Sequence, residues 1–282
     1  MLYYATLAMS LDANVLGTHM GHVLPSVLPE VTGVVYVVNP TQDLTKALVT
    51  DCSDTLTNDT SVRLLSDEQR LKEVMDNFIV ASNAAELVDS NVLTLRVGDV
   101  SEPNSLIVTT SATVAMIQTN NQVAGLIADE IEFVTSVRDS YEQAFESATS
   151  YPLQTPAISS VRSTLASEIG DETRSDFDSV LTTLQTARDD RSALNEVIIS
   201  LLVAAKNNVL LYDISKWGED VGIASKATFS RTKTELEESG LIDTEKVPID
   251  VGRPRLRLKL GHNQLVRASS DQLAGVAESL LA

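Results

Sequence analysis

The clearest pattern in the sequence is "SKATFSRTKTELEESGLI", residues 225–242, which is followed shortly by "VGRPRLRLKL", residues 251–260. The first stretch predicts a helix, because Ser225 is a favoured N-cap residue and Gly240 is a favoured stop. The segment between them, "LIDTEKVPID", and the second stretch predict two strands joined by a tight turn. The sequence therefore predicts a helix followed directly by a β-hairpin.

Two further helical patterns precede this helix, over residues 192–208 and 210–223. In the third helix Phe229 and Leu236 lie two turns apart on one face, so we expect them to pack on the first two helices. We expect Ser192 to cap the first helix. Three helices followed by a hairpin form a winged helix-turn-helix, in which the third helix enters the DNA major groove.

The third helix and the hairpin carry the candidate DNA-binding residues. On the helix, polar and basic side chains are expected to face outward, toward base edges. On the second strand, Leu256, Leu258 and Leu260 are expected to point inward and the cations outward, about 6–7 Å apart. That spacing resembles the spacing of phosphates, and a cation beside Pro254 at the tip is placed to enter the minor groove. The candidates are Ser225, Lys226, Thr228, Ser230, Arg231, Lys233, Arg253, Arg255, Arg257 and Lys259.

Two plainer interpretations remain open for these cations. A row of cations on a strand also occurs as a solvated face or as protection against edge-to-edge pairing. Lys226 and Arg231 could equally be ordinary surface charges. The coincidence of the row with a complete winged helix favours contact with DNA.

The chain as a whole is strongly acidic. It has 39 Asp and Glu against 21 Lys and Arg, a formal charge of -18, and most of the cations lie between residues 188 and 267. Few lysines and many aspartates are typical of proteins from a high-salt cytoplasm, where salt screens repulsion beyond about 3 Å. An acidic mesophile protein with an acidic partner-binding face is the alternative. The single Cys52 suits a cytoplasmic protein.

The N-terminal part predicts an α/β or α+β domain with a mixed sheet. Short apolar runs such as 33–40 alternate with helical patterns, one of which begins at Ser66 and breaks near Ser82 or Asn83. We expect a helix from Ser10 or Asp12 and another from Ile127. The predicted division is a sensor or assembly domain over 10–150, a helical linker over 151–190, and a winged-helix domain over 191–282.

Oligomerisation is predicted from the helices between residues 125 and 190. The helices near 157–169 and 175–187 carry thin apolar stripes, which often pair with a second copy of the same chain. A single winged helix with few cations also needs a second half-site for useful affinity. We therefore expect a homodimer. A C-terminal helix is expected to pack its Leu273, Val276, Ala277 and Leu280 face on the first winged-helix element or on the partner.

The sequence offers little for catalysis. Three histidines, of which His19 and His22 are neighbours on a possible helix, are too few for a zinc site without cysteines. We expect no enzyme activity, no cofactor and no metal, although a degenerate nucleotide-processing enzyme stays as an alternative. Residues 1–8 read as an extension, and no apolar run is long enough to span a membrane.

The motif "S-x-x-T-F-S-R" with "L-E-x-x-G-L-I" and the "GRP" of the hairpin resemble TrmB-like and MarR-like winged-helix regulators. The whole chain resembles haloarchaeal transcriptional regulators of the TbsP type, with an acidic N-terminal domain before this winged helix. The resemblance implies promoter binding and control of sugar or central carbon metabolism genes. Independently of the resemblance, we expect the N-terminal domain to sense a small metabolite, to mediate assembly, or both. The alternative is a protein-interaction module that uses the winged helix for docking without DNA.

Overall fold

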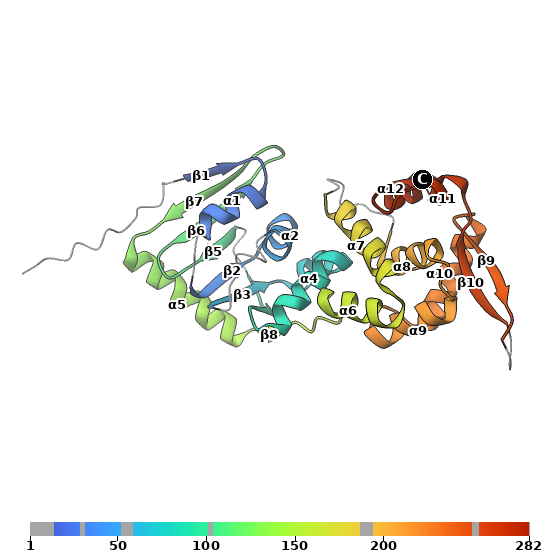
Figure 1. Cartoon of the computed structure of the whole chain (residues 1–282). Helices are drawn as coiled ribbons and strands as arrows, with labels where there is room; N and C mark the ends of the chain where they lie inside the picture. The colour runs from blue at the N-terminus through green and yellow to red at the C-terminus, as the bar shows by residue number, and fades with distance from the viewer. Residues whose placement is uncertain are drawn as a thin grey trace, which may run out of the picture. The chain divides into compact units, whose positions relative to one another are not determined.

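A computed structural model describes residues 14–28, 32–51, 59–100, 104–186, 194–249 and 254–281. Contacts within the chain divide it into two compact units (Figure 1). The first unit comprises Met1–Asp76 and Leu87–Leu153, and the second comprises Asn77–Glu86 and Gln154–Ala282. Among the described residues, no helix is both long and apolar enough to cross a membrane.

The first unit is built on an eight-stranded sheet with the strand order β1-β7-β6-β5-β2-β3-β4-β8. Strands β2, β3 and β4 are parallel, and every other pairing is antiparallel. The predicted mixed sheet is therefore confirmed. The strands are β1 (Asn14–Gly17), β2 (Gly33–Val38), β3 (Thr60–Ser66), β4 (Leu93–Val97), β5 (Ser105–Val108), β6 (Thr113–Gln118), β7 (Val123–Ala128) and β8 (Thr149–Ser150).

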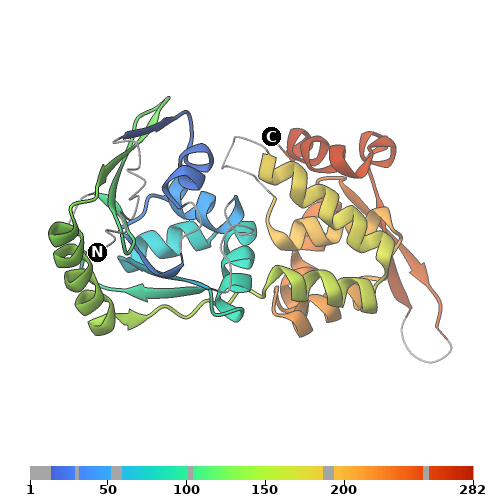
Figure 2. The same ribbon diagram turned by 60° about the vertical axis from the view of Figure 1, so that its left-hand side comes forward.

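Helices cover both faces of this sheet. The helix α5 (Ile131–Ser147) packs on one face, where its Phe145 meets Tyr36 of β2 and Val108 of β5. The opposite face faces α1 (Met20–Val27) and α2 (Gln42–Thr50), as Figure 2 shows. The remaining helix of the first unit is α3 (Glu68–Met75), whereas most of the next helix, α4 (Phe78–Asp89), belongs to the second unit. The apolar residues of β2, whose two faces are both covered, read in the sequence as a continuous run.

Three local predictions in this region were wrong. The helix expected from Ser10 or Asp12, which lie outside the described residues, is replaced by strand β1, and α1 begins only at Met20. The helix expected from Ile127 begins at Ile131, because residues 123–128 form a strand paired with both β1 and β6. Such short apolar runs fit a helix or a strand equally well until their pairing partners are known.

The third error concerns the break in the long helical pattern after Ser66. The break lies between α3 and α4, at residues 76–77, and not at Ser82 or Asn83. The side-chain oxygen of Asn77 accepts hydrogen bonds from the backbone nitrogens of Ile79 and Val80, at 3.1 and 3.2 Å. Asn77 therefore starts a new helix, since an asparagine in this position satisfies otherwise unpaired N–H groups.

The second unit is a helical domain with a β-hairpin, as predicted. Its core includes Trp217, Phe229 and Phe177, none of which is exposed. The single tryptophan also donates a hydrogen bond from its ring nitrogen to Thr164, at 3.0 Å. The elements are α6 (Ile158–Glu168), α7 (Asp171–Thr186), α8 (Glu196–Lys206), α9 (Leu211–Val221), α10 (Lys226–Glu238), β9 (Ile242–Val247), β10 (Arg255–Leu260), α11 (Asn263–Arg267) and α12 (Ser270–Leu281).

The apolar stripes of α6 and α7 are used inside the unit. Phe177 and Leu181 of α7 are buried in the same core as the winged helix. The helix α12 packs on α7 and buries the predicted face, with Leu273 and Ala277 at 1% and 0% exposure. The inference that these thin stripes pair with a second copy was therefore wrong, because the chain supplies their partner itself. The homodimer stays a prediction on other grounds.

Candidate nucleic-acid interface

The turn between α9 and α10 is set by two residues. Gly222 ends α9 with a φ of 92°, a left-handed conformation that favours glycine. Ser225 then caps α10, and its hydroxyl oxygen accepts a hydrogen bond from the backbone nitrogen of Thr228 at 3.1 Å. The predicted cap at Ser225 is confirmed. The capping of α8 differs, because Asn195 performs it and Ser192 lies outside the described residues.

The helix α10 is held on α9 by close packing. Phe229 is fully buried, and Leu236 is 3% exposed. The ring of Phe229 occupies the space beside Gly218 of α9, where an added Cβ would lie 2.3 Å from two ring carbons. This contact fixes the position of α10 against α9 and leaves its opposite face toward solvent.

Most of the predicted helix residues do lie on that outward face. Lys226, Ser230 and Arg231 are exposed, and Thr228 is half-buried beside the hydroxyl of Ser225, at 3.0 Å. The ammonium group of Lys226 lies 2.5 Å from a carboxylate oxygen of Glu219. The hydrogen bond from Lys226 lowers the pKa of Glu219 below its ordinary value. Within the described part of the chain, Arg231 has no ion-pair partner.

Lys233 does not share the outward face, contrary to the prediction. It is 9% exposed, and its ammonium group contacts Glu237 at 2.6 Å. Lys233 follows Phe229 by one helical turn, so both belong to the buried side of α10. Burial raises the pKa of Glu237, but hydrogen bonds from Lys233 and Thr244 outweigh it and the pKa is lowered. The period of the helix already predicts that residue 233 lies on the buried side of α10.

The hairpin of β9 and β10 forms the wing. Its register places Arg257 opposite Glu245 and Leu258 opposite Thr244. Leu258 is fully buried, and its backbone nitrogen donates to the carbonyl of Val209 at 2.9 Å, which joins β10 to the residues before α9. Leu258 is therefore buried as predicted, whereas Leu256 and Leu260 are only half-buried, like the cations between them, so the predicted alternation is confirmed only at Leu258. Arg253 lies outside the described residues.

The cations of the wing have acidic neighbours that the sequence did not reveal. The guanidinium of Arg255 lies 4.1 Å from the ring centre of Tyr212 and 3.4 Å from Asp213. The ammonium group of Lys259 lies 2.6 Å from Glu245, and this contact lowers the pKa of Glu245. Arg255 and Lys259 keep 37% and 45% of their side chains exposed. The row is therefore accessible, but carboxylates already occupy part of it.

DNA binding through these cations would require their ion pairs with the neighbouring carboxylates to break. An exposed ion pair is worth only about 0–1 kcal/mol, so breaking it costs little. A phosphate oxygen would replace the carboxylate at Lys226 and Lys259, and the released carboxylate would remain nearby. The acids thus weaken attraction to any polyanion. This favours contacts with good geometry over unspecific attraction.

Glu219→Gln is expected to strengthen DNA binding and to reduce its selectivity. The change removes a negative charge and frees Lys226 for a phosphate, which adds about 0.9 to the log–log salt slope. Affinity for unrelated DNA, measured by fluorescence anisotropy across a KCl series, should rise more than affinity for the operator. Glu238→Gln, an exposed acid at the end of α10, is the matched control. An equal gain in both variants would show that net charge alone is responsible.

Comparison with known proteins identifies the two units. Residues 157–278 match the family model "Transcriptional regulator TbsP-like, C-terminal HTH domain". Residues 12–156 match "Transcriptional regulator TbsP-like, N-terminal". The chain belongs to the TbsP-like transcriptional regulators. The family confirms that this chain is a regulator and not an enzyme, and its helix-turn-helix domain makes DNA its partner.

Solved structures resemble this TbsP-like chain only in part. TrmBL2, "an archaeal chromatin protein", matches with 10% identity and a TM-score of 0.38 over 51% of this chain and 57% of its own. Nuc from Salmonella typhimurium, a phospholipase D family member, matches with 14% identity and a TM-score of 0.35 over 49% of this chain and 98% of its own. NucT from Helicobacter pylori matches with 12% identity, a TM-score of 0.36 and the same coverages. No curated protein matches the TbsP-like chain.

The two N-terminal histidines of this TbsP-like chain lie next to each other, but the described residues supply no further metal ligands beside them. The rings of His19 and His22 lie 3.7 Å apart between centroids. Among the residues that the structure describes, no group of three or more histidine, cysteine or acidic side chains could hold a metal ion.

Proposed function

We propose that this TbsP-like regulator binds promoters of sugar or central carbon metabolism genes in a halophilic archaeon. It would act in the cytoplasm as a homodimer, with a small metabolite as the effector of its N-terminal unit. The observation that carries the DNA-binding part is an accessible cationic surface in a chain of charge -18, formed by the outer face of α10 and the wing. The family resemblance in the winged helix supports the choice of genes.

The proposed contacts divide between the two elements. Ser225, Thr228, Ser230 and Arg231 lie in the N-terminal half of α10, from which recognition helices reach base edges. Lys226 lies beside them. The wing residues Arg255, Arg257 and Lys259 are proposed to meet phosphates, and Arg253 the minor groove. Lys233 is left out because it is buried.

High salt shapes this mechanism. The affinity gained by releasing counterions falls with a slope of about -0.9 per phosphate contact, so it contributes little at molar salt. Specific binding then depends on hydrogen bonds to bases, apolar contacts and exclusion of water. The excess of acids, which fits a high-salt cytoplasm, supports this setting.

Two copies are proposed because one winged helix offers few contacts. Helix-turn-helix proteins commonly bind two half-sites one helical turn apart. The predicted division into 10–150, 151–190 and 191–282 also remains a proposal. Contacts within the chain group the segment from Gln154 with the winged helix.

Thr228→Ala and Arg231→Ala are each expected to relax the choice of sequence. If the side chain contacts a base, its loss costs about 1–3 kcal/mol on the operator and much less on unrelated DNA. Competition gel shifts with single-base operator variants measure this difference. Both affinities falling together would assign the residue to the phosphate backbone.

Genome-wide DNA occupancy of the tagged chain tests the whole proposal. We expect occupancy at promoters of carbon metabolism genes, and a change in occupancy when the preferred carbon source is withdrawn. The docking-module alternative predicts no sequence-dependent occupancy in either condition. The same experiment with Arg231→Ala shows whether the occupied sites depend on α10.

A further inference from the structure

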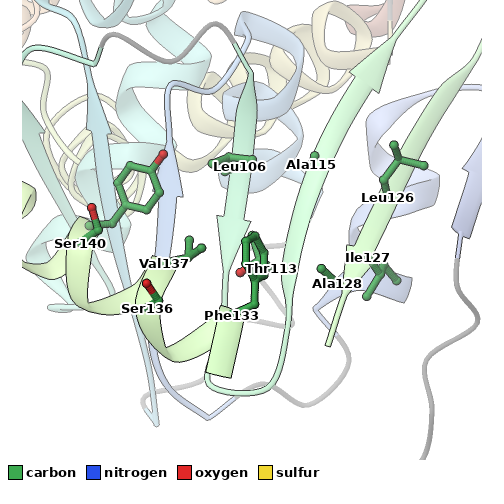
Figure 3. Close-up of a pocket in the computed structure, with 11 residues that line it drawn as sticks. Leu106, Thr113, Ala115, Leu126, Ile127, Ala128, Phe133, Ser136, Val137 and Ser140 are labelled. Carbon is green, nitrogen blue, oxygen red and sulfur yellow. The ribbon is translucent and has the colours of Figure 1, made fainter. Parts of the chain in front are cut away.

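The first unit contains an open groove between α5 and the antiparallel half of its sheet. Its volume is about 510 Å³, within the range of roughly 300–1,000 Å³ that small-molecule sites occupy. Figure 3 shows Phe133 and Val137 of α5 on one side and Leu126 of β7 on the other. The groove is therefore of the right size for a metabolite.

The fold explains why the groove is there. The register places Thr113 opposite Ala128 and Ala115 opposite Leu126, so all four point to the sheet face on which α5 lies. The helix α5 packs mainly on β2 and β5. The small side chains of Ala115 and Ala128 leave the floor of the groove hollow between the larger walls.

Among the residues that the structure describes, one hydroxyl in the groove has no hydrogen-bond partner. Thr113 lines the groove and is 6% exposed, and its side-chain oxygen forms no hydrogen bond with any other described group. A buried polar atom without a partner is unfavourable and is rare in folded proteins. The hydroxyl groups of Ser136 and Ser140 lie on the facing side of the same groove. A ligand with a polar group would satisfy the hydroxyl of Thr113.

Charge restricts which ligands fit. None of the described side chains that line the groove is charged, so no cation is available there for a phosphate or carboxylate. The exposed acids Asp129, Glu130 and Glu132 directly follow β7 in the sequence and repel anions. A ligand cation would likewise lose its hydration without gaining a partner within the groove. The ligand that suits this site is uncharged.

We propose that the groove binds an uncharged, mostly apolar small molecule through one hydrogen bond to Thr113. The proposal deepens the proposed function, in which the N-terminal unit senses a metabolite, and it rests on that function for its regulatory meaning. It excludes phosphorylated and carboxylated metabolites from this site. Binding itself is testable without DNA.

A second copy of the chain is the competing occupant. Leu16, Ile117 and Ile131 are 77%, 47% and 63% exposed, and large exposed apolar patches often mark protein interfaces. Leu16 and Ile117 lie on the same sheet face as Leu126. The buried position of Thr113 favours a small molecule, because a second copy would cover the exposed rim without reaching that hydroxyl.

The test uses two fluorescent probes that share one skeleton. N-phenyl-1-naphthylamine is neutral and has one N–H group, whereas 1-anilino-8-naphthalenesulfonate carries an added anionic group. The full-length chain is expected to bind one molecule of the neutral probe, and the anionic probe at least tenfold more weakly. Thr113→Val should reduce affinity for the neutral probe about two- to twelvefold, since one hydrogen bond is lost. The same variant should raise the midpoint of thermal unfolding, because the unpartnered hydroxyl is gone.

Two further variants separate the groove from its surroundings. Ala115→Phe fills the floor and should abolish probe binding, whereas Ile117→Ser, on the same face but outside the groove, should leave it intact. Equal affinity for both probes, or binding unchanged in Thr113→Val and Ala115→Phe, would overturn the proposal. The proposal would also be overturned if probe binding fell as the chain concentration rose and sedimentation showed dimers at those concentrations. Gel shifts of the same variants measure DNA binding directly, so that a failure of the groove proposal can be distinguished from a failure of the DNA-binding proposal.

Discussion

Phe229→Ala is expected to lower the free energy of unfolding of the second unit by about 3–5 kcal/mol, the usual cost of deleting a buried ring. The ring is fully buried and fills the space beside Gly218, so its loss leaves a cavity between α9 and α10. Because this contact fixes α10, the proposed recognition helix, DNA binding should be lost as well. Trp217 is the only tryptophan and is fully buried in this core, so its fluorescence during denaturant unfolding reports the second unit selectively.

The control for this prediction is a double-mutant cycle. Gly218→Ala alone should destabilise the unit, because its Cβ would lie 2.3 Å from the Phe229 ring. In a Phe229→Leu background the same change should cost less, since the shorter side chain leaves room for a methyl group. Contacting residues couple by about 0.5–3 kcal/mol. Strictly additive effects would show that the ring and the glycine do not determine each other.

Arg255→Ala/Arg257→Ala is expected to weaken binding to every DNA sequence alike. If each arginine neutralises one phosphate, the log–log salt slope falls by about 1.8 per protomer. The loss of affinity should then grow about 60-fold when salt is lowered tenfold, and it should nearly vanish at molar salt. Titrations of operator and unrelated DNA across a KCl series measure both quantities.

Arg267→Ala is the matched control for the wing variant. Arg267 is an exposed cation of α11 that belongs neither to the outer face of α10 nor to the wing. Its loss should leave the salt slope unchanged. A wing variant with the slope of the parent chain would remove the wing from the interface and leave α10 alone. Circular dichroism of both variants verifies that the fold is retained.

The winged helix could be predicted from the sequence because its signals are local. The Ser225 cap, the Gly222 and Gly240 turns and the spacing of Phe229 and Leu236 each act within a few residues. Lys233 was placed wrongly even so, although it lies one helical turn from Phe229. Its charge suggests an exposed position, whereas the period of the helix places it on the buried side with Phe229.

The features that could not be predicted depend on contacts between residues far apart in the sequence. The acids beside the wing, Asp213 and Glu245, are identified only when α9 and the hairpin register bring them to Arg255 and Lys259. The strand β7 resembled the start of a helix until β1 and β6 paired with it. The groove beside Thr113 likewise requires knowing that α5 packs mainly on β2 and β5 and that a pocket remains between it and the strands β6 and β7. None of these three features can be predicted from a short stretch of the sequence taken alone.

The packing of α7 against α12 has an evolutionary consequence. One helix precedes the winged helix in the chain and the other follows it, yet each covers the apolar side of the other. A descendant that lost either helix would expose Phe177 or Leu273 to water and would be prone to aggregate. The two segments should therefore be inherited together, and a gene fusion or truncation that ends between them should be rare among descendants of this lineage.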